Sequence, residues 1–380
     1  MTDAVIIAAA RTPVGRANKG ALVDVDAFRL AQIAVQGVLD RADIPTADID
    51  DLVIAESLQG GGVIARHTAV ELGLTGVPGL ADNRHCAAGL SAVQIAAGSI
   101  RAGMDRVVVA GGTESLSSMV FGTKKGETWM SPSHTPTPEA PAFDMALTVG
   151  ENTARLAGIS RRDADEWAYH SHLRAAESRD SGRFDEEIVP VPLPDGSLFT
   201  RDEHPRADTT LEKLASLPVV HPEIEGATVT AGNAAGLNDA AAAVVLTSDD
   251  YARANGIAPL ARIRSWASVG VDPVRTGLAP ILAVPKALDR AGLSLADVDL
   301  FEINEAFCTV AVATSRQLGI DHSIMNVNGS GCGLGHPIAA TGARMVVTMI
   351  HELRHRGGNI GLVGMCAGGG MASALVIELL

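Results

Sequence analysis

The sequence predicts an α/β protein built from two duplicated halves, with a further domain inserted into the first half. Residues 39–54 (LDRADIPTADIDDLVI) recur as residues 288–303 (LDRAGLSLADVDLFEI), with eight of the sixteen aligned pairs identical at an offset of 249. Self-similarity of this kind is typical of a duplicated structural unit. Short apolar segments that resemble strands also alternate with helical runs along the chain, which is the pattern of α/β units.

The strands of the two halves can be paired in order. The predicted pairs are 5–10 with 261–266, 106–112 with 359–370, and 240–246 with 372–378. A tight glycine turn joins the last two strands of the second half, whereas about 125 residues separate the equivalent strands of the first half. The predicted division is a first half of residues 1–115 plus 239–259, an inserted domain of residues 116–238, and a second half of residues 260–380. Because the strands are mostly apolar, we expect largely parallel sheets with both faces covered.

The bulk composition excludes several classes of function. The chain has 380 residues, of which 47% are hydrophobic and 19% charged, and its formal net charge is −14. That charge argues against partners such as nucleic acid or an anionic membrane. No apolar run approaches the length of about 18 residues that a membrane span needs, so we expect none. The opening MTDAVIIAAARTPVG predicts a first strand rather than a signal peptide.

The cysteines indicate the compartment. Cys86, Cys308, Cys332 and Cys366 are widely spaced and form no CxxC pair. This pattern favours free thiols in a reducing compartment, and hence a cytoplasmic protein, over disulfides or a zinc site.

The first candidate site residue is Cys86, in the segment NRHCAAGLSAVQ at residues 83–94. It stands where an amphipathic run with helical spacing begins. Adding the offset of 249 to 86 gives 335, one residue short of His336, and Pro337 suits the first turn of a helix. The duplication therefore predicts that Cys86 and His336 lie at equivalent helix N-termini, brought together by a pseudo-twofold axis.

Such a placement has chemical consequences. The unpaired N–H groups and the dipole of a helix N-terminus stabilise a thiolate and disfavour an imidazolium. The expectation is a reactive Cys86 beside a neutral His336 that serves as its base. Two other interpretations stay open at this point, because a cysteine opening an apolar helix is often a packing residue and a histidine after a glycine-rich loop is often only a cap.

Further candidates occupy the ends of predicted strands. Asn304 and Glu305 follow the strand DLFEI, and Cys366 ends the strand IGLVGMC just before three glycines that begin at Gly368. Glycine lets the backbone approach a ligand closely and present its N–H groups. Cys308 and Cys332 have no comparable setting, and we assign both to packing.

One motif is expected to be a decoy. Residues 351–355 read HELRH, the HExxH pattern of zinc proteases. At helical spacing an apolar stripe forms from Met345, Val346, Met349, Ile350 and Leu353. His351 and His355 fall on the opposite side, which we expect to face solvent, and we predict no metal site.

Taken in order, several motifs resemble those of the thiolase family. They are NRHCAAGL, GGTES, TVTAGNAAGLND, NEAF, GSGCGLGHP and CAGGG, and the resemblance covers nearly the whole chain. It implies an α-β-α-β-α layered fold of two thiolase halves plus a loop domain that binds coenzyme A. The implied activity is that of an acyl-CoA C-acyltransferase, which cleaves 3-ketoacyl-CoA by thiolysis or condenses acyl-CoA with acetyl-CoA. Coenzyme A is then a substrate, and no metal or redox cofactor is expected.

The resemblance also implies a role for each site residue. Cys86 would carry the acyl group as a thioester, and His336 would be the base that activates it and a donor to an oxyanion. Asn304 would position a water at the same oxyanion site. Cys366 would exchange a proton with the Cα of acetyl-CoA or with the leaving group. Gly368 would donate its backbone N–H, with that of Cys86, to a second oxyanion site.

Coenzyme A contacts are implied at five further positions. Ala231 and Ala235 belong to the motif that meets the pantetheine arm, and Ala235 replaces the serine of many relatives. Arg206 falls where a basic residue meets the nucleotide phosphates, and Lys213 would strengthen that patch. For both charges an ordinary solvated side chain is the alternative. Met145 lies in the substrate region.

The sequence gives less information about the substrate and the oligomeric state. Acetoacetyl-specific relatives have a His-Met pair where this chain has Met145-Ala146, which argues against strict short-chain specificity. The loop 119–144 is shorter than the tetramer-forming loop of some relatives, so we expect a homodimer rather than a homotetramer. Two other functions stay open: a ketosynthase-like condensing enzyme, against which Asn304 and Cys366 argue, and a non-catalytic acyl-CoA-binding protein.

Overall fold

The computed structural model describes residues 2–59, 61–119, 122–124, 127–130 and 132–380. Its main feature is a ten-stranded mixed sheet in which nine strands follow the order β12-β13-β14-β11-β1-β10-β5-β3-β4 and β2 (Gly15–Arg16) pairs with β10. The first-half strands are β1 (Ala4–Arg11), β3 (Asp51–Ala55), β4 (Gly79–Asp82), β5 (Val107–Ser115) and β10 (Asn238–Ser248). The second-half strands are β11 (Ala261–Gly270), β12 (Leu300–Ile303), β13 (Ile360–Ala367) and β14 (Met371–Leu379).

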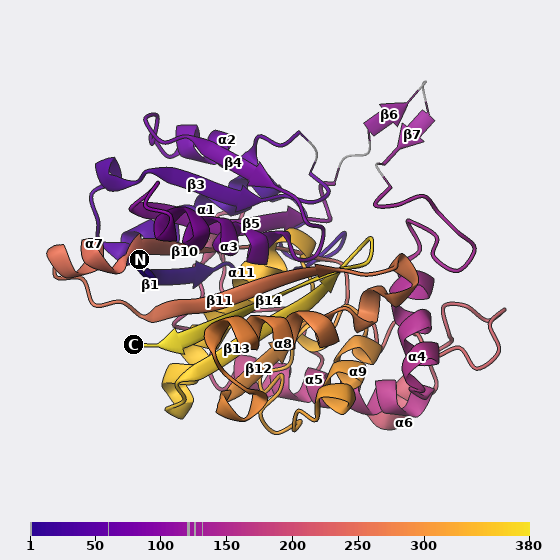
Figure 1. Cartoon of the computed structure of the whole chain (residues 1–380). Helices are drawn as coiled ribbons and strands as arrows, with labels where there is room; N and C mark the ends of the chain where they lie inside the picture. The colour runs from indigo at the N-terminus through magenta and orange to yellow at the C-terminus, as the bar shows by residue number, and fades with distance from the viewer. Residues whose placement is uncertain (1, 60, 120–121, 125–126, 131) are drawn as a thin grey trace.

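The strand order confirms the predicted duplication. The first half runs β4-β3-β5-β10-β1, and the second half repeats this pattern as β12-β13-β14-β11. An isolated bridge between Phe301 and Met325 stands beside β12 where β4 stands beside β3. The two halves join where β1 pairs with β11 over only two residue pairs. Figure 1 shows the purple strands β3, β4 and β5 of the first half lying above the yellow strands β13 and β14 of the second half.

Helices cover both faces of this sheet. They are α1 (Ala27–Ala42), α2 (Ile64–Glu71), α3 (Ala88–Arg101), α4 (Asn152–Ala157), α5 (Arg161–Asp180), α6 (Leu211–Ala215), α7 (Asp249–Ala254), α8 (Pro280–Ala291), α9 (Cys308–Leu318), α10 (Gly331–Leu334) and α11 (Ile338–Arg356). One core cluster combines α3 and α11 with strand residues from both halves. A second cluster holds α1 against the first half, and a third holds α8 and α9 against the second. Helices α3 and α11 thus pack between the two halves of the sheet, with α1 on the outer face of the first half and α8 and α9 on the outer face of the second. Counted across both halves, the layers alternate α-β-α-β-α, as the resemblance implied.

The expectation of largely parallel sheets is wrong. Only the pairs β3/β4, β3/β5 and β12/β13 are parallel, whereas the pairs around β1, β10, β11 and β14 are antiparallel. Strand β13 turns directly into β14 through a glycine turn in which Gly369 and Gly370 have φ values of 83° and 79°, and so short a connection can only join antiparallel strands. Apolar strands covered on both faces look alike in sequence whichever way their neighbours run.

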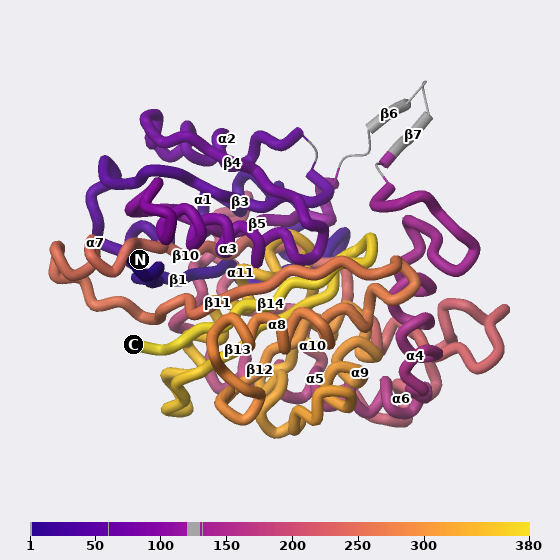
Figure 2. Tube along the Cα trace, in the orientation of Figure 1, coloured from indigo at the N-terminus to yellow at the C-terminus, as the bar shows by residue number. Residues whose placement is uncertain are grey.

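Between β5 and β10 the chain forms the inserted segment. It contains β6 (Gly122–Lys124), β7 (Glu127–Trp129), a π-helical turn (Ala146–Glu151), α4, α5, β8 (Val191–Pro192), β9 (Leu198–Phe199) and α6. In Figure 2 its magenta helices α4, α5 and α6 lie beside the orange chain of the second half. Part of the loop 119–144, on which the expectation of a dimer rested, lies outside the described residues. The proposed domain boundaries stay predictions.

Buried ion pairs attach the insertion to the sheet. Arg11 of β1 pairs with Glu187 at 2.6 Å and with Asp202 at 2.7 Å, and all three side chains are essentially inaccessible to solvent. Arg11 is thereby stabilised as a cation, because a buried charge needs partners of this kind.

The two central helices meet at their N-terminal ends. A Cβ on Gly89 would lie 2.3 Å from the carbonyl oxygen of Ala339, and a Cβ on Gly112 would lie 2.1 Å from the same atom. Only glycine permits such an approach. The starts of α3 and α11 are therefore held together, which positions the residues just before each helix.

Candidate active site

Cys86 lies two residues before α3 begins at Ala88. Its side chain is partly buried and its thiol is free. Burial raises the pKa of the Cys86 thiol to about 11, and the negative charge of Glu114 adds to this, although the N–H of Gly368 opposes it. In the free protein desolvation outweighs the stabilisation that the helix N-terminus gives to a thiolate, and the role of Cys86 as a reactive thiol stays a prediction.

His336 lies two residues before α11 begins at Ile338, so it occupies the position equivalent to Cys86. It is buried, and its backbone N–H donates to Asn238 Oδ1 at 3.0 Å. Burial lowers the pKa of His336 to about 3, and the positive charge of Arg344 contributes in the same direction. The ring is thus neutral at pH 7, as expected, although the cause is burial more than the helix dipole.

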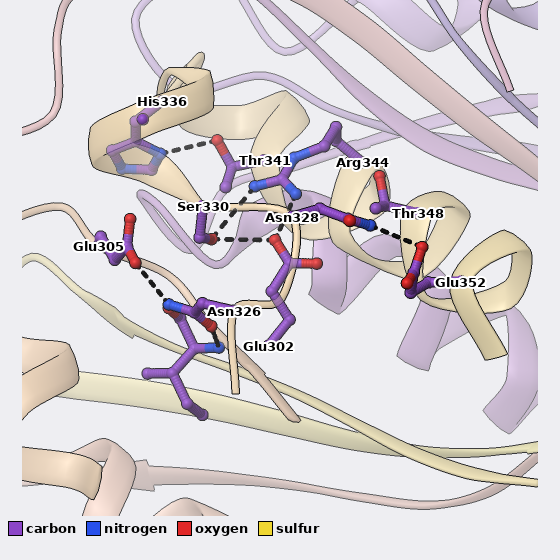
Figure 3. Close-up of polar contacts among 12 residues, drawn as sticks. Glu302, Glu305, Asn326, Asn328, Ser330, His336, Thr341, Arg344, Thr348 and Glu352 are labelled. Carbon is purple, nitrogen blue, oxygen red and sulfur yellow. Dashed lines mark hydrogen bonds and ion pairs between the residues drawn. The ribbon is translucent and has the colours of Figure 1, made fainter. Parts of the chain in front are cut away.

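The hydrogen bonds of this ring indicate its tautomer. The Nδ1 atom of His336 lies 2.7 Å from Thr341 Oγ1, as Figure 3 shows. The Thr341 hydroxyl donates its single proton to Pro337 O at 2.8 Å, so its oxygen must accept from Nδ1–H. The lone pair of the neutral ring then resides on Nε2, which lies 3.5 Å from Asn304 Nδ2.

Asn304 follows β12 and is completely buried. Its backbone N–H donates to Gly364 O at 3.0 Å, and its side-chain Oδ1 is buried without a partner in the described residues. Such an atom costs free energy unless something else bonds it. Oδ1 also lies 2.5 Å from where a Cβ on Gly331 would stand. His336 and Asn304 therefore form a buried polar pair in which Asn304 Oδ1 is an acceptor without a partner among the described residues.

Cys366 lies near the end of β13 and is buried. Burial raises the pKa of the Cys366 thiol, and a charge on Cys86 raises it further. Cys366 packs in an apolar cluster with Val149 and Val310, against which Met145 also packs.

The structure thus forms two groups from the predicted residues. Cys86, Cys366 and Gly368 make one group, and His336 with Asn304 makes the other. Within the described residues no hydrogen bond joins the sulfur of Cys86 to the ring of His336, whose nitrogens are directed to Thr341 and Asn304. The two groups meet where α3 and α11 begin.

Glu305, the neighbour of Asn304, is structural. Its buried carboxylate accepts hydrogen bonds from Trp167 Nε1 at 2.8 Å, Ser171 Oγ at 2.6 Å and Asn326 Nδ2 at 2.7 Å. These bonds connect α5 of the insertion to the strand end that carries Asn304.

A buried polar network continues beneath His336 (Figure 3). Arg344 pairs with Glu302, whose carboxylate also accepts from Ser330 Oγ at 2.9 Å. Farther along α11, Glu352 accepts from Asn328 Nδ2 at 2.8 Å. These groups tie α11 to β12 and to the loop that precedes His336, and so they fix the position of the ring.

Sequence reasoning missed three residues of this surrounding layer. Thr341 and Asn238 hold the ring and the backbone of His336. Glu114, at the end of β5, is completely buried and accepts from Gln59 Nε2 at 2.7 Å and from Ala339 N at 3.0 Å. The motif GGTES contains Glu114, but a sequence motif does not say which backbone group its carboxylate reaches.

The residues expected to contact coenzyme A are spread over two places. Met145 lies at the candidate site, with its Sδ 3.8 Å from where a Cβ on Gly368 would stand. Ala235 N donates to Ala306 O at 3.0 Å, next to Asn304, whereas Ala231 is exposed.

Arg206 and Lys213 lie at the surface. Lys213 Nζ pairs with Asp208 Oδ2 at 2.8 Å. The hydrogen bond from Lys213 lowers the pKa of Asp208, and the charges of Lys213 and Arg206 contribute in the same direction. Lys213 is thus paired with Asp208 in this structure, and its contribution to a basic patch stays a prediction.

The HExxH segment has no metal-binding arrangement. His355 is exposed as predicted, but His351 is largely covered, with its Nδ1 3.9 Å from Glu186. Burial lowers the pKa of His351 to about 4. Glu352 points into the buried network. No group of three or more His, Cys, Asp or Glu side chains within the described ranges could hold a metal ion.

The predicted packing residues agree with the structure. All five residues of the apolar stripe on α11 are buried. Cys308 and Cys332 are buried in the core cluster that packs beneath the second half, and neither belongs to the two groups of site residues.

This fold and site define a class. The family models "Thiolase, N-terminal domain" and "Thiolase, C-terminal domain" match residues 4–250 and 257–379. The chain belongs to the thiolase family, and its activity is that of a thiolase acyltransferase.

Individual thiolases are similar to this chain over its full length. The chain is 40% identical over 396 residues to the acetyl-CoA acetyltransferase of Cupriavidus necator and 39% identical over 407 residues to the 3-ketoacyl-CoA thiolase of Bacillus subtilis, covering 100% of each pair. Among solved structures, it matches the acetyl-CoA acetyltransferase of Bacillus anthracis with a TM-score of 0.92 and 38% identity, covering 100% of this chain and 99% of that one. Human mitochondrial 3-ketoacyl-CoA thiolase in complex with CoA matches with a TM-score of 0.92 and 34% identity, covering 100% and 98%.

Proposed function

We propose that this thiolase-family enzyme carries the acyl group on Cys86 while it cleaves a 3-ketoacyl-CoA into acetyl-CoA and a shortened acyl-CoA, or runs the reverse condensation. The observation that supports this most directly is the placement of Cys86. Its thiol is free and only partly buried just before the start of α3, and the backbone N–H of Gly368 lowers its pKa. The neutral pair His336 and Asn304 lies at the adjoining helix start.

The first half-reaction acylates the enzyme. Cys86 loses its proton to Nε2 of His336 as its sulfur attacks the C3 carbonyl of the substrate. Because burial raises the pKa of the free thiol to about 11, the proton leaves as the substrate is attacked rather than beforehand. The oxyanion that forms on C3 accepts the N–H groups of Gly368 and Cys86.

Cleavage then follows from the same arrangement. The C2–C3 bond breaks, C3 becomes the thioester carbon on Cys86, and the bonding electrons pass to the enolate of acetyl-CoA. The enolate oxygen faces His336, with a water held by the free Oδ1 of Asn304. Cys366 donates its proton to C2, which completes acetyl-CoA and leaves Cys366 as a thiolate.

The second half-reaction restores the enzyme. Free coenzyme A loses its thiol proton to Cys366 and attacks the thioester, so the acyl group moves from Cys86 to coenzyme A. The released Cys86 sulfur takes back the proton from His336. This is a ping-pong sequence through a covalent intermediate, and none of its steps calls for a metal ion or a redox cofactor.

Coenzyme A binding is proposed for the inserted segment. Met145 and Ala235 adjoin the site, and Ala231 and Arg206 lie farther out on the insertion, where an elongated ligand would extend. Lys213 contributes less, since Asp208 neutralises it. The solved complex of the human relative with CoA supports the ligand class.

We also infer a homodimer, rather than a tetramer, in the cytoplasm. The four free cysteines favour a reducing compartment. Within the described residues no helix is both long and apolar enough to cross a bilayer.

The test of this function is intact-protein and peptide mass spectrometry after mixing the enzyme with acetyl-CoA in the absence of an acceptor. One acetyl group is expected on the peptide that contains Cys86, removed again by added coenzyme A. Turnover accompanied by acylation at another residue would overturn the mechanism. Absence of both turnover and coenzyme A release would instead indicate a non-catalytic binding protein.

A further inference from the structure

A buried histidine that takes no part in the proposed chemistry lies next to the segment that carries His336. His204 is 4% exposed and stands in the loop between β9 and α6. The two residues before it fix this loop, because Asp202 Oδ1 accepts from Val14 N at 2.7 Å and Glu203 N donates to Val14 O at 3.1 Å. The backbone that carries the imidazole is therefore tied to the residues that follow β1.

Both ring nitrogens of His204 are hydrogen-bonded. Nδ1 lies 3.2 Å from Asn238 Nδ2, and Nε2 lies 3.1 Å from Cys332 O. An amide nitrogen only donates and a carbonyl oxygen only accepts, so Nδ1 carries the lone pair of the ring and Nε2 carries its proton. Burial lowers the pKa of His204 to about 3, so the ring is neutral at pH 7, and this one tautomer satisfies both partners.

The side-chain amide of Asn238 connects His204 to His336. Asn238 is completely buried. Its Nδ2 donates to Gly15 O at 2.8 Å and to His204 Nδ1, while its Oδ1 accepts from His336 N at 3.0 Å. The two protons on the amide nitrogen are thus both used, and the oxygen is left facing His336. Without the imidazole, one N–H of this amide would be buried and unpaired, which is unfavourable enough to displace the side chain.

The other hydrogen bond of His204 reaches the turn that leads into His336. Cys332, whose carbonyl accepts it, belongs to α10, which ends two residues before His336. Gly335, which separates α10 from His336, has a φ of 110°, and a Cβ there would lie 2.8 Å from Asn238 Oδ1. The imidazole therefore holds both the turn that enters His336 and the amide that receives its backbone N–H.

We propose that His204 is a positioning residue for His336 in the acylation step. It does not touch the substrate; it fixes the amide of Asn238 and the carbonyl of Cys332, and these two groups fix the backbone of His336. A displaced backbone would carry the ring away from the thiol of Cys86, and so would slow proton transfer without altering how the substrate is bound. The inference rests on the proposed function and adds a residue of the inserted segment to it.

Two variants separate the hydrogen bonds of this ring from its bulk. His204→Leu fills the space but bonds neither partner. His204→Asn places its Oδ1 near the position of the native Nδ1, so it keeps the bond to Asn238 and loses only the bond to Cys332. The exposed His355→Leu is the matched control and should behave as the native enzyme does.

The measurement is rapid-quench acetylation of Cys86 over a range of acetyl-CoA concentrations. His204→Leu is expected to lower the maximal rate constant by about 10–100-fold, the size usual for outer partners that orient a functional histidine, and to leave the half-saturating concentration unchanged. His204→Asn should recover most of the rate, because the amide of Asn238 keeps all its partners. Urea unfolding is measured beside it, since a merely structural role would make the rate follow the stability, and both variants lose stability.

A native maximal rate in His204→Leu, or a His204→Asn variant as slow as His204→Leu, would overturn the inference. If His204→Leu does not fold, His204→Phe keeps a planar ring in the same space and makes the same comparison. Absence of the acetyl group from Cys86 in the native enzyme would defeat the proposed function instead, so the two failures are distinguishable.

Discussion

The starts of α3 and α11 are equivalent by duplication and yet differ in how they are held. Cys86 has a free thiol beside one backbone N–H, and the strained His85 precedes it. His336 is bonded at its backbone, at Nδ1 and at Nε2, and a buried ion pair lies beneath it. The first position exposes a soft nucleophile, whereas the second immobilises a ring.

The difference follows from what each group must do. An acyl group on Cys86 needs space and moves between two substrates, so polar ties to the sulfur would obstruct it. A base is useful only in one tautomer and one orientation, which hydrogen bonds to the ring supply. Duplication has thus provided two helix starts, and substitution of the surrounding residues has given them opposite properties.

The largest effects are expected when each of the two thiols is removed in turn. Cys86→Ala should abolish both thioester formation and turnover, because it removes the atom that bonds the acyl group. Cys366→Ala should still be acetylated by acetyl-CoA but should lose turnover by a factor on the order of 10²–10⁴, since it lacks the positioned acid and base. The measurement is deuterium uptake at the α-carbon of acetyl-CoA, followed beside acylation.

A native rate of α-proton exchange in Cys366→Ala would show that Cys366 is a packing residue without a role in proton transfer. The double variant provides an internal control. It should be no worse than Cys86→Ala alone, because residues of one catalytic unit have non-additive effects.

Several features of this comparison were predictable from the sequence. The repeat at residues 39–54 and 288–303 placed Cys86 and His336 at equivalent helix starts, because a duplicated sequence must fold into a duplicated unit. The resemblance in ordered motifs predicted the family. Alternating apolar strands and helices predicted an α/β fold, since that pattern depends only on local burial.

Tertiary contacts were not predictable. The direction of β10 and β14 depends on which strands they meet, so the expected parallel sheets were wrong. The pKa of Cys86 depends on the depth of its burial and on Glu114, neither of which a helix-start argument contains. The pairing of Lys213 with Asp208, five residues earlier, was not predicted either, because a loop has no sequence periodicity from which a side-chain contact follows.

The hydrogen bonds that hold the ring of His336 can be tested at Thr341. Thr341→Val preserves the shape of the side chain but leaves the Nδ1–H of His336 without an acceptor, so the ring can take the wrong tautomer. The acylation rate should fall by about 10–100-fold, the size usual for outer partners that orient a functional histidine. Rapid-quench measurement of acetyl-enzyme formation across pH checks this.

Thr341→Ser is the matched control, because it retains the hydroxyl and should keep the native rate and pH profile. A serine variant as slow as the valine variant would show that packing of the methyl group, rather than the hydrogen bond, is what matters at this position.

Acid should lower the stability of the folded protein through the buried neutral histidines near the start of α11. His204 Nε2 lies 3.1 Å from Cys332 O, and its Nδ1 lies 3.2 Å from Asn238, which also holds His336. Burial lowers the pKa values of His204 and His336 to about 3. Below the ordinary histidine pKa of about 6.5 the unfolded chain binds protons that the folded chain refuses, so stability falls as the pH drops from about 6.5 toward 3.

Each such histidine contributes a slope of about 1.4 kcal/mol per pH unit in that window. Urea unfolding of the native enzyme and of His204→Gln at pH 7, 6, 5 and 4 measures the difference. The variant starts less stable, having lost two hydrogen bonds, but its free energy of unfolding should fall less steeply with acid. Parallel slopes would mean that His204 is protonated as readily in the folded protein as in the unfolded one.

The smallest effect is expected at the far end of α11, where the chain offers the zinc-protease pattern without its geometry. His355 faces solvent, Glu352 is held by Asn328, and His351 lies against Glu186, so the pattern presents no shared metal position. The double variant His351→Gln/His355→Gln should therefore keep native thiolysis, and its stability should change by at most about 1 kcal/mol, because neither ring makes a short hydrogen bond. Elemental analysis of native and variant protein should find no bound zinc in either. Stoichiometric zinc in the native enzyme that is lost in the variant would show that the two histidines converge in solution and that the C-terminal end of α11 binds a metal ion.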